Sequence, residues 1–236
     1  MRRFFGRKED DKIIIDGGEC FHMKKVLRMN EKDNVIACVN DENDYYCTIE
    51  KMNKDNAVLT IDRIERNKAL PNRNIVLFQM LPKKDYFDEI LPKAIELGVN
   101  EIYFFTSQYS SGKNFKRERV DSQVLSACKQ CERSILVPVH DVLDFEDMIK
   151  KLDGFDTIIF ANEHEKDQHF TTSMVEDKDN IAVVIGGEGG FSEDEAKALI
   201  KQGASSFTLG SRILRCDTAV AVSYTHLRAH ETLSDV

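Results

Sequence analysis

The spacing of apolar segments changes once along the chain, near residue 70, and this change constrains the fold more than any other feature. Between residues 12 and 66, short apolar runs alternate with turn signals such as Asp16-Gly17-Gly18 and the polar run 40–44. Strands at this spacing are typical of a small β-barrel or sandwich. After the polar segment 67–72, apolar runs of strand length alternate with amphipathic stretches of helix length. That alternation is typical of a mainly parallel sheet covered by helices.

We therefore predict an α/β protein with two domains, residues 1–70 and residues 71–236. The predicted strands cover residues 13–15, 35–39, 45–49, 57–61, 75–79, 102–105, 157–161 and 181–185. The predicted helices cover residues 21–28, 85–97, 117–133 and 193–202. Ser192 and Glu195 have the spacing of a capping box at the start of the last of these helices. Pro92 falls inside a predicted helix, where proline removes a backbone donor and disfavours a straight helix.

Composition and targeting signals place limits on the class of protein. Charged residues make up 31% and hydrophobic residues 42% of the chain, which excludes wholesale disorder. The apolar runs, such as residues 181–185, are far shorter than the roughly 20 residues of a membrane-spanning helix. The N-terminus has no apolar signal-peptide core, so we expect a cytoplasmic protein with reduced thiols. Cys128 and Cys131 are read as helix residues one turn apart, and the histidine spacing implies no metal.

The distribution of charge allows, but does not require, a nucleic-acid partner. The net charge of −8 argues against a protein coated with nucleic acid. Residues 1–30 hold eight basic and five acidic side chains, and residues 111–135 hold six and three, so each segment has a net charge of +3. Residues 141–200 hold five lysines and sixteen acids, a net charge of −11. The two basic segments fit a specific RNA contact and ordinary solvated faces equally well.

Two motifs near the C-terminus carry the clearest chemical signal. Residues 185–195, Ile-Gly-Gly-Glu-Gly-Gly-Phe-Ser-Glu-Asp-Glu, leave a buried strand through four glycines and enter a helix. Glycines let the backbone approach a ligand closely, and the amides at a helix start bind anions or polar ring edges. Residues 209–219, Leu-Gly-Ser-Arg-Ile-Leu-Arg-Cys-Asp-Thr-Ala, place two arginines three residues apart before an acid. Taken alone, the first motif also fits a tight turn and the second a helix with a solvated basic face.

Taken together and in this order, the two motifs resemble the RsmE family. These are SPOUT-class methyltransferases that form 3-methyluridine in small-subunit ribosomal RNA. The resemblance covers about nine-tenths of the chain and also includes these segments: 1–5, His22-x-x-x-Val26-Leu27-Arg28, 81–85, 93–98 and Gln130-Cys131-x-Arg133. It implies an N-terminal PUA-like β-barrel that binds RNA and a C-terminal trefoil-knot domain that binds S-adenosyl-L-methionine. It further implies a homodimer that acts on the small ribosomal subunit.

The chain departs from the family pattern at three places. Gly187 stands where the family usually has proline, and Cys216-Asp217 stands where it usually has Thr-Glu. After Thr218-Ala219 the family continues as an apolar helix that packs on the cofactor loops and the dimer interface. Here residues 223–236 resemble a stretch that translated sequencing-adapter contamination appends to reading frames. We expect this tail not to be native. If it forms a helix, its apolar residues make a stripe too narrow to bury much surface.

The chemistry implied by the resemblance assigns roles to particular residues. Uridine N3 must lose a proton, and arginines stabilise the developing negative charge. The expected catalytic residues are Arg212, Arg215, Glu188 and Asp217, of which either acid takes the proton or holds an arginine. The expected cofactor-binding residues are Glu163, Gly187, Gly189, Leu209, Gly210, Ile213 and Thr218. The expected RNA-binding residues are Arg2, Arg3, His22 and Arg28. Two other functions remain open: a methyltransferase acting on another RNA such as transfer RNA, and an inactive RNA-binding protein.

Overall fold

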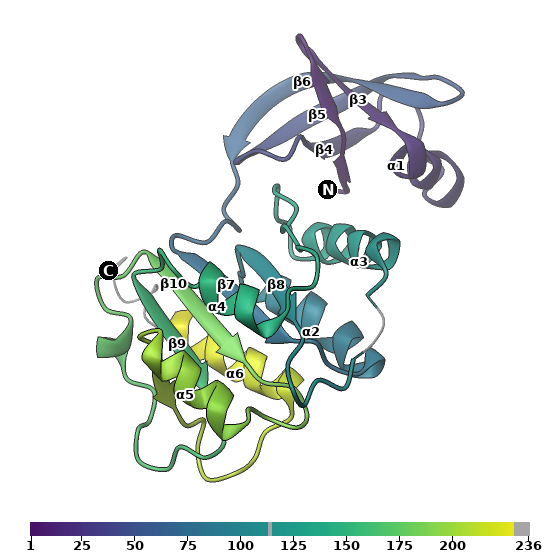
Figure 1. The fold of residues 1–236 in the computed structure, drawn as a ribbon. Helices are drawn as coiled ribbons and strands as arrows, with labels where there is room; N and C mark the ends of the chain where they lie inside the picture. Colours follow the sequence, from purple (N-terminus) through teal and green to yellow (C-terminus); the bar gives the residue numbers. More distant parts are fainter. Residues whose placement is uncertain (113–114, 229–236) are drawn as a thin grey trace. The chain divides into compact units, whose positions relative to one another are not determined.

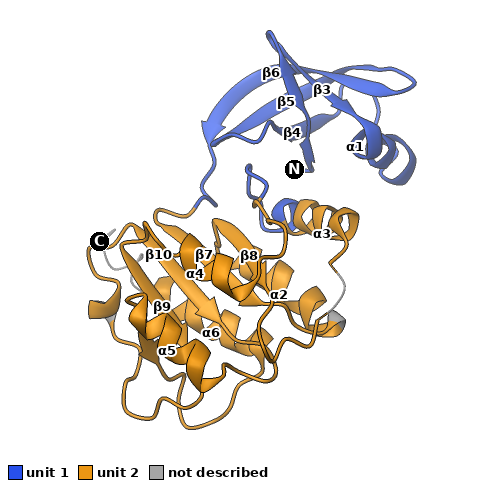
Figure 2. Cartoon of the chain, viewed as in Figure 1, with its two compact units in different colours: residues 1–70, 128–136 blue, residues 71–127, 137–236 orange. Residues whose placement is uncertain are grey.

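A computed structural model describes residues 1–112 and 115–228 of the chain (Figure 1). These residues form two compact units, which Figure 2 distinguishes by colour. Unit 1 contains residues 1–70 together with the segment 128–136, and unit 2 contains residues 71–127 and the chain from residue 137 onward. The segment 128–136 therefore belongs to a different unit from the residues on either side of it. No helix within the described ranges has the length and apolar character needed to cross a membrane.

Unit 1 is built on a curled six-stranded sheet with the strand order β1-β4-β5-β6-β3-β2. Its strands are β1 (Arg3–Phe5), β2 (Arg7–Glu9), β3 (Lys12–Asp16), β4 (Asn34–Cys38), β5 (Asn43–Met52) and β6 (Asn56–Arg66). β1 and β4 pair in parallel and the remaining neighbours are antiparallel. The apolar residues that alternate along these strands meet in one core, which includes Phe4, Ile13, Val35, Ile49 and Leu59. The four predicted strands of this part of the chain are confirmed.

The helical segment of unit 1 begins earlier than the sequence predicts and changes its winding. It consists of α1 (Gly17–Phe21) followed by a π-helix, η1 (His22–Val26). The N–H of Leu27 donates to the carbonyl of His22 at 3.0 Å, five residues back, which is the π-helical pattern. Gly17 adopts a φ of +52°, so the Asp16-Gly17-Gly18 turn signal is where the helix begins. Met23 anchors the segment because its side chain is fully buried in the core of the unit.

Unit 2 is built on a five-stranded sheet in which every neighbouring pair is parallel, with the order β11-β9-β10-β7-β8. Its strands are β7 (Asn74–Met80), β8 (Glu101–Phe105), β9 (Thr157–Ala161), β10 (Asn180–Ile185) and β11 (Ser205–Phe207). Its helices are α2 (Lys84–Glu96), α4 (Phe145–Lys151), the short 3₁₀ helix η2 (Thr172–Met174), α5 (Glu193–Lys201) and α6 (Cys216–Arg228). α3 (Arg117–Gln130) has its first eleven residues in this unit. The predicted parallel sheet with covering helices is confirmed.

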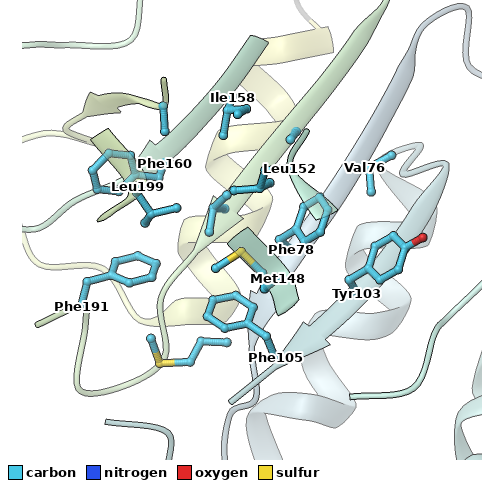
Figure 3. Close-up of a cluster of buried hydrophobic side chains, with 14 residues drawn as sticks. Val76, Phe78, Tyr103, Phe105, Met148, Leu152, Ile158, Phe160, Phe191 and Leu199 are labelled. Carbon is cyan, nitrogen blue, oxygen red and sulfur yellow. The ribbon is translucent and has the colours of Figure 1, made fainter. Parts of the chain in front are cut away.

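Helices cover both faces of this sheet, which explains why its strands read as continuous apolar runs. Figure 3 shows one face, where Phe78, Phe105 and Phe160 meet Met148 of α4 and Leu199 of α5. The neighbouring residue Phe104 points to the other face, where its ring lies 4.7 Å from that of Phe87 of α2. α2 continues through Pro92, and it packs against α6. α4 and β11 are the elements of this sheet and its cover that the sequence pattern missed.

The C-terminal helix extends into the part of the chain that resembles an appended tail. α6 runs from Cys216 to Arg228, and residues 229–236 lie outside the described residues. Within the first six positions of the tail, Ser223, Tyr224 and Leu227 are buried. We expected the apolar stripe of residues 223–236 to bury little surface, and this is wrong for Tyr224 and Leu227. These two residues lie one helical turn apart on the buried face of α6.

Candidate functional site

A pocket lies at the carboxyl edge of the parallel sheet of unit 2, where the loops after β9, β10 and β11 meet. Its volume is about 690 Å³ including the open mouth. The lining comes from three segments of the chain: residues 161–163, residues 185–187 with 190–191, and residues 208–214 with Cys216 and Ala219. The two motifs that the sequence singled out therefore form opposite parts of one pocket, and the end of β9 completes it.

The glycine loop of residues 186–190 gives the pocket a wall made of backbone. Gly190 has a φ of +63°, and a β-carbon at this position would collide with the carboxylate of Glu163. A β-carbon on Gly187 would lie 3.1 Å from the sulfur of Met80. These glycines therefore permit close contacts that a larger residue would block. Phe191 fixes the far end of the loop, because its ring packs 5.9 Å from that of Phe160 (Figure 3).

The start of α5 ties the glycine loop to a neighbouring loop. Ser192 Oγ accepts the N–H of Glu195, and Glu195 Oε2 accepts the N–H of Ser192 at 2.9 Å, so the predicted capping box is confirmed. The other oxygen of Glu195 accepts the N–H of Gln108 at 2.9 Å. Glu195 is buried, and its carboxylate thus joins the helix start to the loop that follows β8.

The opposite wall of the pocket, residues 208–216, combines a turn that depends on a glycine with an open rim. Gly210 has a φ of +112°, and its N–H donates to Thr208 Oγ1 at 3.2 Å. Arg212 and Ile213 follow on the rim and are both exposed. Ile213 is 83% exposed although it lines the pocket, so an apolar side chain stands in solvent at the mouth.

The structure brings together five of the seven residues predicted to bind a cofactor. Glu163, Gly187, Leu209, Gly210 and Ile213 line the pocket. Thr218 and Gly189 lie outside this lining. Several lining residues were not singled out from the sequence: Asn162, Gly186, Gly190, Phe191, Thr208, Ser211, Leu214, Cys216 and Ala219. Most of them belong to the same two motifs, so the motifs located the pocket more accurately than the individual residues did.

Gly189 has a different role from Gly190. Its φ lies outside the left-handed region, and a β-carbon there would lie 2.8 Å from Cβ of Tyr109 and 3.3 Å from the carbonyl oxygen of Tyr109. Gly189 is therefore required by the close approach of the loop after β8, on the side of the glycine loop that does not line the pocket.

Glu188 holds two loops and contacts neither arginine of the predicted catalytic set. One of its carboxylate oxygens accepts the N–H of Lys83 at 3.0 Å, and the other accepts the hydroxyl of Ser111. Partial burial acts to raise the pKa of Glu188, but these hydrogen bonds outweigh it and lower that pKa. A carboxylate with both oxygens engaged and a lowered pKa is a weak proton acceptor. The geometry thus favours a structural role for this acid.

Asp217 is buried at the start of α6, with 7% of its side chain exposed. Its Oδ2 accepts Lys93 Nζ at 3.1 Å, and Oδ1, which has no hydrogen-bond partner among the described residues, lies 3.9 Å from Nε of Arg215. The guanidinium of Arg215 lies 5.7 Å from the centre of the Tyr86 ring. Of the two predicted acids, Asp217 is therefore the one beside an arginine.

The residues predicted to bind RNA lie in unit 1 and differ in exposure. Arg2 and Arg28 are exposed and His22 is half-buried. Arg28 adopts a φ of +52°, which is uncommon for a residue other than glycine.

Arg3 is buried, which contradicts the prediction that it binds RNA. Its guanidinium pairs with Asp44, with Nη2–Oδ2 at 3.0 Å, and also donates to Cys38 Sγ at 3.2 Å. Asn67 donates to the same aspartate at 2.8 Å and to the carbonyl of Glu132 at 2.8 Å. A guanidinium committed to buried partners is not available to a phosphate, because exposing it would break those contacts. Arg3 thus joins β1 to Asp44 of β5, and Asn67 joins the same aspartate to the segment 128–136.

Metal and disulfide chemistry find no support in the described part of the chain. No three His, Cys, Asp or Glu side chains among the described residues are placed to hold a metal ion together. Among the cysteines of the described ranges, Cys20, Cys38, Cys47 and Cys216 are free thiols. Burial raises the pKa of Cys216, the one that lines the pocket, to about 11.

Comparisons with known proteins cover nearly the whole chain. Residues 68–228 match a family model described as an RNA methyltransferase domain, and residues 15–62 match an RNA methyltransferase PUA domain. The chain is 31% identical to ribosomal RNA small subunit methyltransferase E of Bacillus subtilis, with 90% of this chain and 88% of that protein covered. It is 29% identical to the protein of the same name from Mesomycoplasma hyopneumoniae, with 93% and 95% covered.

Solved structures share the fold. The chain superimposes on a ribosomal RNA small subunit methyltransferase E from Neisseria gonorrhoeae bound to S-adenosyl methionine with a TM-score of 0.84. The two sequences are 22% identical, and 97% of each chain is covered. A Legionella pneumophila methyltransferase with bound cofactor gives a TM-score of 0.85 at 21% identity, again with 97% of each chain covered.

Proposed function

The chain belongs to the RNA methyltransferase family whose curated members are named ribosomal RNA small subunit methyltransferase E, and we propose that it methylates N3 of a specific uridine in 16S ribosomal RNA with S-adenosylmethionine as donor. The observation that supports this proposal is the pocket that the glycine loop and residues 208–216 form together at the carboxyl edge of the sheet. Ligands of open α/β sheets bind at the carboxyl ends of the strands.

The residues that line the pocket fit a nucleoside cofactor with a positive charge. Gly186, Gly187 and Gly190 offer backbone to the edge of a flat ring, and the absence of a β-carbon on Gly190 lets the carboxylate of Glu163 lie against the loop. Apolar side chains such as Ile185 and Leu214 supply contact for the faces of that ring. Glu163 adds a carboxylate, which suits the ribose hydroxyls or a cationic group. We therefore assign the cofactor to this pocket.

When bound, the cofactor supplies an activated methyl group on a sulfonium, so the protein's own contribution is positioning and charge. Arg212 on the pocket rim and Arg215 beside Tyr86 are the cations available to stabilise a uridine ring that has lost its N3 proton. Asp217 orients Arg215 and Lys93, and Glu188 holds the loops of residues 83 and 111. In this arrangement both acids hold other groups in place.

Unit 1 supplies the RNA-binding surface in this proposal. Arg2, His22 and Arg28 are its candidate contacts, because their side chains are exposed or half-buried and the first thirty residues carry a net charge of +3. Phosphate contacts by such cations set the affinity for RNA and make it depend on salt. We further propose a cytoplasmic homodimer, in which a second copy covers the exposed Ile213 at the pocket mouth. Analytical ultracentrifugation tests the dimer.

Methyl transfer to defined RNA tests the proposed function. Unmodified small ribosomal subunits are incubated with the protein and cofactor carrying a labelled methyl group, and the digested nucleosides are analysed by mass spectrometry. We expect labelled 3-methyluridine, no label in transfer RNA, and cofactor binding by calorimetry. Label in transfer RNA alone would assign the chain to a different RNA. Cofactor and RNA binding without any label in either RNA would identify an inactive RNA-binding protein.

A further inference from the structure

The cofactor pocket uses only three of the five strand ends at the carboxyl edge of unit 2. It is built after β9, β10 and β11, whereas β7 and β8 lie on the other side of β10 in the sheet order. The glycine loop after β10 forms the boundary between these two halves. Since a methyl acceptor must lie next to the methyl donor, the half formed after β7 and β8 is the nearest surface of this unit that the cofactor leaves open.

The loops of this second half are joined into one rigid surface, which we call the ledge: residues 81–83, residues 107–112, and Glu188-Gly189. The N–H of Gly112 donates to the carbonyl of Leu81 at 3.1 Å, which joins the loops after β7 and β8. Glu188 accepts from Lys83 and Ser111, one residue from each loop. The loop that follows β8 is therefore held to both of its neighbours.

Two further contacts fix the ledge beside the glycine loop. Glu195 accepts the N–H of Gln108 at 2.9 Å, and Ser110 Oγ accepts the N–H of Ser107 at 2.7 Å. The absence of a side chain on Gly189 lets Tyr109 approach the glycine loop closely. A surface loop with this many specific contacts presents its exposed side chains in a defined geometry, which is what a binding surface needs.

The exposed side chains of the ledge have the chemistry of nucleotide recognition. Tyr109 is 46% exposed, although its Cβ is packed against Gly189. Lys83 is exposed, and its own backbone N–H is held by Glu188. Arg215, with 71% of its side chain exposed, lies against Tyr86 in the helix that follows Lys83. Unstacked bases of RNA bind to surfaces that carry exposed aromatic rings together with cationic side chains.

We propose that the ledge receives the target nucleotide, and that Tyr109 stacks on the flipped-out base while Lys83 contacts an adjacent phosphate. This inference rests on the proposed methylation of RNA, and it assigns the acceptor side of that reaction. Enzymes that modify a base take it out of the stack and hold it against aromatic side chains. Tyr109 would determine how well the base is placed, without contact with the cofactor on the far side of the glycine loop.

The chain offers a clean optical test because it contains no tryptophan. Tyr109→Trp places a single indole on the ledge, and its emission is followed while unmodified small ribosomal subunits are added. We expect quenching that saturates with subunit concentration. The matched control is Ile200→Trp, because Ile200 is 55% exposed near the end of α5, away from the carboxyl edge, and should show no quenching. Equal quenching of both variants, or none at position 109, would overturn the proposal. The proposal would also be overturned if the emission changed with protein concentration but not on addition of ribosomal subunits, since that result would assign Tyr109 to an interface between copies of this chain.

Kinetics separate a stacking role from a purely structural one. Tyr109→Ala should lower kcat/KM for methyl transfer by roughly 5- to 150-fold, the range that base–aromatic stacking gives, with the cofactor Kd unchanged. Tyr109→Phe should retain the wild-type rate within about twofold, because the stacking face is preserved. The assignment would be overturned if Tyr109→Ala lost cofactor affinity by the same factor as kcat/KM. It would also be overturned if Tyr109→Phe lowered kcat/KM as much as Tyr109→Ala does. If the Tyr109→Trp variant is quenched as expected, but wild-type protein binds cofactor and transfers no methyl group, the result would instead count against the proposed function.

Discussion

Gly190 offers a sharp test of the pocket, because two separate constraints act on it. Its φ of +63° is strained for any other residue, and a β-carbon there would collide with the carboxylate of Glu163. Gly190→Ala therefore costs about 1–2 kcal/mol of stability from the left-handed backbone alone. It also pushes Glu163 out of its position at the pocket, where the loss of one charged hydrogen bond to the cofactor is worth about 1.5–3 kcal/mol.

Gly203 separates these two effects. It adopts a φ of +94° after α5, and a β-carbon there would meet no atom within 4 Å. Gly203→Ala should thus also introduce backbone strain from a positive φ, without touching the pocket. For a chain of this length, both variants should lose roughly 2–8 °C in Tm. Only Gly190→Ala should weaken cofactor binding, by roughly 10- to 150-fold in Kd.

The assay is isothermal titration calorimetry with S-adenosylmethionine, preceded by thermal melting of each variant. Equal cofactor Kd values for the two folded variants would refute the reasoning, because the contact between Gly190 and Glu163 would then have no bearing on the ligand. A third variant, Glu163→Gln, keeps the shape of the side chain and removes its charge. If charge is what Glu163 contributes, this variant should also bind more weakly while its Tm stays unchanged.

Three further predictions concern other parts of the chain. Arg28→Ala should weaken binding to ribosomal RNA and reduce the slope of log K against log salt by about one, with an unchanged cofactor Kd; an unchanged slope would remove Arg28 from the phosphate contacts. Hydrogen bonds from Ser111 and Lys83 lower the pKa of Glu188 below its ordinary value of 4.5, so the stability that they contribute is present above pH 4.5 and is lost as the pH falls through the lowered pKa. Urea unfolding of wild type and Glu188→Gln should therefore converge at acid pH, and a gap that is constant with pH would contradict this. Tyr224→Ala should lower the free energy of unfolding by about 3–5 kcal/mol because Tyr224 is fully buried in α6, and a loss below about 1 kcal/mol would show that this part of the tail is not packed as described.

The sequence by itself determined the features that depend on neighbours along the chain. The central strands β9 and β10 of unit 2 were readable because both faces of the sheet are covered, so that neighbouring residues such as Ile159 and Phe160 are both buried and the run is apolar. The capping box of Ser192 and Glu195 was readable because both of its partners lie within one helical turn. The short strand β11 and the helix α4 carried no such local signal, since they have few residues and depend on the sheet for their stability.

The roles of individual site residues were decided by the tertiary structure. The sequence placed Arg3 in a basic segment, but the fold buries it against Asp44, which lies 41 residues away. Gly189 and Gly190 are equivalent in sequence, yet one accommodates Tyr109 and the other Glu163, because the loops after β8 and β9 approach the glycine loop from different sides. The segment 128–136 reads as the end of a helix, and contacts with residues far away in the sequence, such as Asn67, Asp41 and Glu19, place it in unit 1. The same physical reason applies to all of these cases. The hydrophobic pattern of a sequence indicates which side chains are buried, but it does not indicate which buried side chains are in contact. Those contacts depend on the order of the strands in the sheet, which is set by residues far apart in the chain.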